Sequence, residues 1–225
     1  MNYRIHYPDT FPLLEVNLGQ GEMIKAESGA MVTMDETVDV EGKLEGGIMK
    51  GLGRMLAGEK FFFQTLHATR GAGTVTLAPT YIGGLIPLEL DGMHGYMIQK
   101  DGFLASSNSV EIETKMQNLA KGLFSGEGFF VMRVYGKGTV FVNSYGAIHE
   151  VEIPAGRQVV IDNQHLVAWS DQMQYTIDKA AKGWVSSFTS GEGLVCRFSG
   201  PGKVYIQTRN PGAFAQWINS MVPAK

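Results

Sequence analysis

A glycine pattern that occurs three times restricts the fold of this chain more than any other feature. The Gly-x-Gly stretches begin at Gly71, Gly136 and Gly200, at intervals of 65 and 64 residues. Each follows an apolar run that opens on a Gly-Glu pair: Gly58-Glu59, Gly126-Glu127 and Gly191-Glu192. The interval exceeds the 20–50 residues of common solenoid repeats. Each copy is therefore predicted to be a small β module.

The order of elements inside a copy also recurs. An extended stretch ends near Asp35, Asn108 or Asp171; a segment of helical spacing, the Gly-Glu pair, an apolar strand and an alternating strand follow. Alternation in 74–77 and 203–207 is typical of half-buried strands. Because Gly-x-Gly allows positive φ between two strand-like runs, we expect a hairpin at each one.

Helical spacing predicts short helices between the strands and a longer one at the C-terminus. Apolar residues with this spacing are Met116, Leu119, Leu123, then Ala180, Ala181, Trp184, Val185 and Phe188. After Asn210-Pro211, a stripe of Phe214, Trp217, Ile218 and Met221 predicts an amphipathic helix that packs on the sheets.

These patterns predict an all-β protein of three tandem β-sandwich modules, with short helices and a C-terminal helix. A module of about 65 residues would bury only about 60% of its unfolded surface, so the three are expected to share a core. We therefore expect one pseudo-threefold domain over residues 1–225, with repeats at approximately 1–90, 91–153 and 154–225.

Composition narrows the function classes. The formal net charge of −3 gives no electrostatic reason to expect nucleic-acid binding. The single cysteine, Cys196, has no intramolecular partner, which fits a reducing compartment. No apolar run suits a signal peptide or a membrane span, so we expect a cytoplasmic protein.

The glycine motifs resemble those of the altered-inheritance-of-mitochondria family of mitochondrial biogenesis proteins, especially its bacterial and archaeal members. The similar stretches are 46–62, Gly126-Glu127, Gly191-Glu192 and 200–211. The resemblance implies a fold like that of the tryptophan RNA-binding attenuation protein, with modules of the short double-stranded β-helix type. It also implies ring-like assembly, such as a homotrimer of nine modules. It supplies no catalytic residues, and the acidic balance departs from the RNA-binding relative.

Candidate chemistry is sparse. The five histidines, His6, His67, His94, His149 and His165, lie far apart, so we expect no metal site and no cofactor. Glu59, Glu127 and Glu192 could converge on a threefold axis and hold a cation, although turn caps or ion pairs are the favoured interpretation.

Asp35, Asn108 and Asp171 suit local turn hydrogen bonds. Residues 136–139 contain only a fragment of a phosphate loop, and Cys196 fits a core position better than a nucleophile.

The best candidate interaction surface lies in residues 46–56. Ile48 and Leu52, with Met55 or Leu56, share one helical face, and Lys50 and Arg54 lie on another. A protein partner or a membrane surface could use this arrangement. A packed connector is the alternative.

The leading functional prediction is a non-enzymatic oligomeric β scaffold or binding protein that assembles with itself. The alternative is a small-ligand-binding protein with pockets between modules, and an enzyme is the least supported class.

Overall fold

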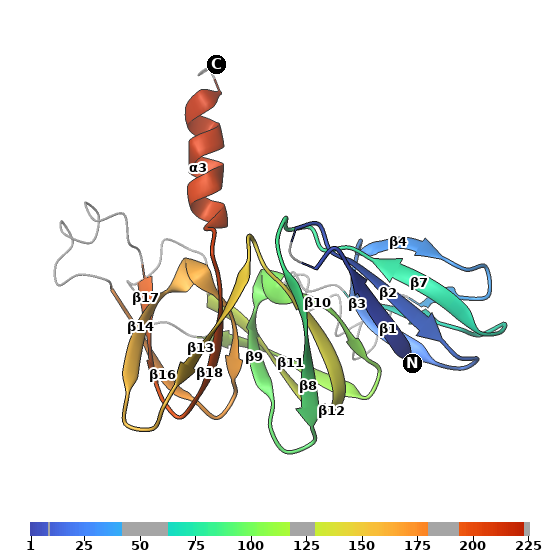
Figure 1. Ribbon diagram of the computed structural model, residues 1–225, viewed down its shortest axis with the longest axis horizontal. Coiled ribbons are helices and arrows are strands. Elements are labelled where there is room, and N and C mark those ends of the chain that lie inside the picture. The colour runs from blue at the N-terminus through green and yellow to red at the C-terminus, as the bar shows by residue number, and fades with distance from the viewer. Residues whose placement is uncertain (9, 42–62, 118–128, 180–193, 223–225) are drawn as a thin grey trace.

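The computed structural model describes residues 1–8, 10–41, 63–117, 129–179 and 194–222. This part of the chain is built mostly of β-strands, with one α-helix at the C-terminus (Figure 1). The strands of the first third are β1 (Asn2–His6), β2 (Leu13–Leu18), β3 (Met23–Glu27), β4 (Met31–Met34), β5 (Asp39–Glu41), β6 (Phe63–His67) and β7 (Gly73–Leu77).

The remaining elements follow without a second long helix in the described ranges. They are β8 (Leu85–Asp91), β9 (Tyr96–Gln99), η1 (Lys100–Gly102), β10 (Phe103–Ser107), β11 (Val110–Gln117), β12 (Phe129–Asn143), β13 (Ile148–Ile153), β14 (Gln158–Asp162), η2 (Asn163–His165), β15 (Leu166–Ser170), β16 (Gln174–Lys179), β17 (Leu194–Ser199), β18 (Gly202–Gln207) and α3 (Pro211–Met221).

One strand pairing recurs three times along the chain. β7 lies between β2 and β4, the second half of β12 between β8 and β10, and β18 between β13 and β15. A second pairing recurs with it: β6 lies between β3 and β5, the first half of β12 between β9 and β11, and β17 between β14 and β16. We call these sets the first, second and third strand groups. Figure 1 shows them side by side, from the first at the right to the third at the left.

The prediction of a hairpin at each Gly-x-Gly stretch is wrong. β6 and β7 lie in different sheets, as do β17 and β18, and β12 runs unbroken through Gly136 and Gly138. The stretches are corners at which the chain leaves one sheet for another. Gly136 has a φ of 99°, and this left-handed backbone turns the strand without pairing it to itself.

Each strand group has a hydrophobic cluster of its own. Leu14, Ile24 and Leu66 belong to the first, Ile98 and Val134 to the second. The third contains Trp169, Cys196 and Phe198. Fully buried residues alternate with less buried ones along β2, which buries Leu14, Val16 and Leu18 on one face, as a period-two pattern requires.

The C-terminal helix forms as predicted but does not pack on the sheets. Asn210 caps it by accepting a hydrogen bond from the Ala213 N–H at 2.9 Å, and Pro211 occupies its first turn. None of its residues is buried, and it projects away from the strands (Figure 1). Its contact with the body is at its base, where the Phe214 ring lies 5.7 Å from that of Tyr145.

One inner helix predicted from the sequence is in part a strand. Met116 lies in strand β11 rather than in a helix, because the strand continues to Gln117 beside β12. The other residues of the predicted inner helices lie outside the described residues. The three extended stretches form β4, β10 and β15, in which Met31, Phe103 and Leu166 hold equivalent places. Met31 is opposite Leu77, as Phe103 is opposite Val142 and Leu166 opposite Ile206.

Candidate assembly edges

Neighbouring strand groups are joined by direct strand pairing. At the first joint β10 runs antiparallel to β3, with Ala105 opposite Ala26. At the second joint β15 runs antiparallel to β9, with Ala168 opposite Ile98. All four of these side chains are fully buried. The two joints therefore use the same kind of strand on each side and the same direction.

Each joint also closes the core of the group before it. Leu104, Ala105 and Phe141 come from the second group but belong to the first hydrophobic cluster. Val167, Ala168 and Tyr205 come from the third group but belong to the second cluster. A strand group thus buries apolar surface on its neighbour, which is the main stabilising contribution to such a contact.

An ion pair fixes the second joint. Asp171 follows β15, and its Oδ2 accepts hydrogen bonds from Arg133 Nε at 2.9 Å and Nη2 at 2.7 Å. Its Oδ1 accepts a third from the Gly95 N–H at 3.0 Å. The hydrogen bond to this carboxylate raises the pKa of Arg133. Of the three residues assigned to local turn hydrogen bonds, Asp171 therefore binds across a joint instead. The Asp35 carboxylate accepts a hydrogen bond from the Thr74 N–H at 2.8 Å, which is also a contact between residues distant in sequence.

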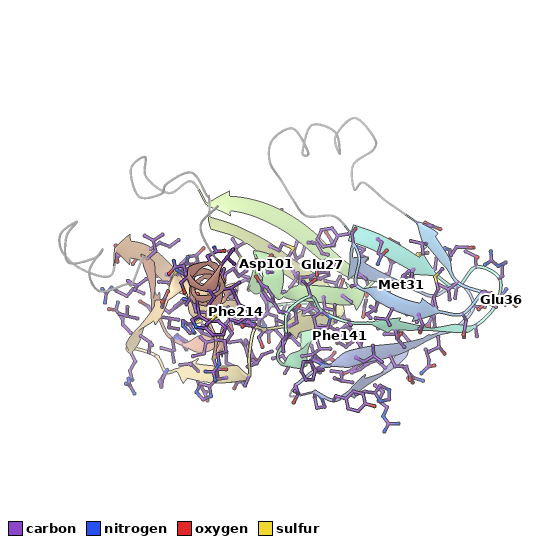
Figure 2. All side chains as sticks on the ribbon, turned by 90° about the horizontal axis from the view of Figure 1, so that it is seen from above. Glu27, Met31, Glu36, Asp101, Phe141 and Phe214 are labelled. Atoms are coloured by element: carbon purple, nitrogen blue, oxygen red, sulfur yellow. The ribbon has the colours of Figure 1, made fainter. Side chains whose placement is uncertain are left out.

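The row of strand groups ends in two open edges. β4 is the last strand of its four-stranded sheet, and β14 is the first of its three-stranded sheet. Neither has a second partner strand within the described part of the chain. They lie at opposite ends of the molecule (Figure 1), and Glu36, just after β4, is at one extremity (Figure 2).

Apolar side chains are exposed on both open edges. On β4, Val32 is 53% and Met34 39% exposed, and on β14, Val160 is 49% exposed. Val32 follows Met31 as Leu104 follows Phe103 and Val167 follows Leu166. Leu104 and Val167 are buried at the joints, at 0% and 1%. The open edges therefore expose apolar residues of the kind that a neighbouring strand group covers at the joints.

The residues proposed from sequence as an interaction surface, Ile48, Lys50, Leu52, Arg54 and Met55, lie outside the described residues. So do Glu59, Glu127 and Glu192. The exposed residues of β4 and β14 were missed, because an apolar residue in a strand is expected to be buried. The available signal was that the extended stretch ending near Asp35 matches, in the sequence, those ending near Asn108 and Asp171.

Three of the five histidines lie beside a carboxylate, and the cysteine lies in the core. His6 contacts Glu15 at 3.1 Å, His67 contacts Glu41 at 3.0 Å, and His94 contacts Asp91 at 3.2 Å. In the residues that the structure describes, no three His, Cys, Asp or Glu side chains gather as metal ligands would. Cys196 is fully buried, which confirms its core position, and burial raises the pKa of its thiol to about 12.

The projecting helix α3 carries a second exposed apolar surface. Phe214, Trp217, Ile218 and Met221 are all exposed along one stripe. No helix in the described ranges is both long and apolar enough to cross a bilayer.

Comparison with known proteins gives close relatives over the whole chain. An uncharacterised protein of Streptococcus pyogenes serotype M6 is 35% identical over 230 residues, which cover 99% of this chain and 92% of that protein. A crystal structure of another Streptococcus pyogenes protein superposes with a TM-score of 0.84 at 33% identity, covering 98% of this chain and 99% of that one. The model of the family "Mitochondrial biogenesis AIM24" matches residues 3–209. This chain belongs to the mitochondrial biogenesis AIM24 family.

Proposed function

We propose that this chain is a non-enzymatic β scaffold that assembles with itself, and that its binding surface is completed by assembly. It consists of three homologous β modules, the strand groups, of the short double-stranded β-helix type found in the tryptophan RNA-binding attenuation protein. A closed homotrimeric ring of nine modules is the proposed form. A cytoplasmic location is part of the proposal, because the one cysteine can form no intramolecular disulfide.

One observation carries the proposal: strand pairing joins neighbouring modules twice, and in the described part of the chain β4 and β14, the strands equivalent to those at the joints, have no second partner strand. β4 has the place in the first module that β10 and β15 have at the joints, and β14 has the place of β3 and β9. An uncovered strand edge is a template for pairing with another chain. Unlike edges at opposite ends favour a head-to-tail contact, which gives a ring when its rotation closes.

Native mass spectrometry and sedimentation of the full chain test this proposal. We expect a closed oligomer, with the trimer as the main species, and a mass that does not grow with concentration. A monomer at micromolar concentration would contradict the scaffold. If that monomer also gained thermal stability from a small molecule, ligand binding between modules would be the better function.

A further inference from the structure

We propose that β4 of one copy pairs antiparallel with β14 of a second copy, with Met34 opposite Val160. This inference rests on the proposed self-assembly and adds the two strands, their direction and their register. The partner is a second copy of this chain, because strands equivalent to β4 and β14 pair with each other at both joints within the chain.

The register on β4 follows from its neighbour strand. Met34 is opposite Val75 of β7, as Ser106 is opposite Val140 of β12 and Trp169 is opposite Val204 of β18. Across the joints, Ser106 is opposite Lys25 and Trp169 is opposite Met97. Met34 is therefore expected to lie opposite the residue of β14 that is equivalent to Lys25 in β3 and Met97 in β9.

That counterpart on β14 is Val160. Its two neighbours, Val159 and Ile161, pack into the third hydrophobic cluster, so Val160 faces away from it. Lys25 lies in the same way between Ile24 and Ala26, both members of the first cluster. The outward side chains at the joints reach the next module: Met97 packs in the third cluster, and Lys25 Nζ donates to the Val110 carbonyl at 2.9 Å.

The same register accounts for the exposed apolar residues. Met34 and Val160 would cover each other, as Trp169 and Met97 do; these are 0% and 6% exposed. Val32 would enter the third module's core, where Leu104 and Val167 enter the first and second. Burial of these three side chains removes apolar surface from water on both copies.

Charges beyond the strand ends agree with this pairing. Two residues after Trp169 stands Asp171, which binds Arg133 across the second joint. Two residues after Met34 stands Glu36, which would lie opposite Gln158 and beside Arg157. Glu36 and Arg157 are both exposed and opposite in charge, so the contact is complementary.

Disulfide capture in the full chain tests the register. The double variant Met34→Cys/Val160→Cys, mildly oxidised, should give covalent dimers and larger species, because directly opposite residues come within disulfide reach. Each single variant should give almost none. Met34→Cys/Gln158→Cys is the matched control, since Gln158 is also exposed on β14 but out of register, and it should cross-link several-fold less. Cys196 can stay, because it is buried.

Charge reversal supplies a second measurement. Glu36→Arg or Arg157→Glu alone should weaken association several-fold at low salt, and the double reversal should restore it. Thermal unfolding checks that each variant folds. Suppose that native mass spectra show an oligomer, but the control pair cross-links as well as the test pair, or neither charge reversal weakens association. Either result would contradict the proposed register but not self-assembly. A monomeric wild-type chain would overturn both.

Discussion

Arg133 and Asp171 form a two-donor ion pair between strands of different groups. The Asp171 side chain is 6% exposed and the Arg133 side chain 35%, so the pair is only partly screened by water. Asp171 also accepts from the Gly95 backbone, so removing its charge affects three hydrogen bonds. This residue connects the second group to the third by more than apolar contact.

Asp171→Asn should lower the free energy of unfolding by about 2 kcal/mol, since hydrogen bonds to a charged group are lost in a buried place. Urea unfolding followed by tryptophan fluorescence measures it. Asp178→Asn is the control: its pair with Arg197, at 3.8 Å, is about half exposed. Its loss should cost less than about 0.5 kcal/mol. Equal effects of the two substitutions would contradict the proposed role of Asp171.

Gly83→Ala should destabilise the fold by about 3 kcal/mol, as overpacking against fixed atoms does. Gly83 forms a bridge to Gly146, and a Cβ there would collide with the carbonyl oxygens of Ser144 and Gly146. Backbone atoms cannot rotate away as a side chain can. Differential scanning calorimetry compares it with Gly19→Ala, whose Cβ would be 3.5 Å from the nearest atom and should have little effect. If Gly83→Ala were as stable as the wild type, the segment that contains Gly83 and the segment 144–146 would have room to move apart.

The Cys196 thiol should resist alkylation in the folded protein. Its pKa of about 12 follows first from burial and then from the nearby carboxylates of Asp162 and Asp178. At pH 8 only about one thiol in ten thousand would be ionised, and the thiolate is the reactive form. Labelling with a thiol reagent, read by mass spectrometry, should be slow in buffer and fast in concentrated urea. Rapid labelling of the folded chain would contradict the buried environment.

Asp91 should make the fold sensitive to acid. Backbone N–H groups of His94 and Met93, and the His94 ring, lower the pKa of Asp91 from 3.8 to about 2. A carboxyl group whose pKa is lower in the folded protein than in the unfolded chain stabilises the fold at pH values above the unfolded-state pKa. This stabilisation is lost as the pH falls through the folded-state pKa. The stability advantage of the wild type over Asp91→Asn should therefore be constant near pH 7 and shrink between about pH 4 and about pH 2. Parallel stability curves for the two proteins would contradict this assignment.

The sequence by itself determined the strands whose apolar residues alternate, although Met116, expected in a helix, lies in β11. Alternation in 74–77 and 203–207 gives β7 and β18, because a strand with one buried face must repeat every second residue. The end of the chain was also predictable, since Asn210 and Pro211 are local signals that start a helix. Cys196 was expected in the core because it stands in an apolar strand. These inferences depend on residues close to one another in sequence.

The tertiary structure alone decided which strands pair and which residues lie at an edge. A glycine that permits a positive φ permits a corner as readily as a hairpin, so the path at Gly136 depends on distant partners. Val32 holds the place in β4 that Leu104 holds in β10, yet only Leu104 is covered, because the cover comes from a segment far away in the chain. Likewise, α3 has an apolar stripe, but none of its residues is buried against the described strands. Local sequence sets the conformation of a segment, whereas its burial depends on which distant segments pack against it.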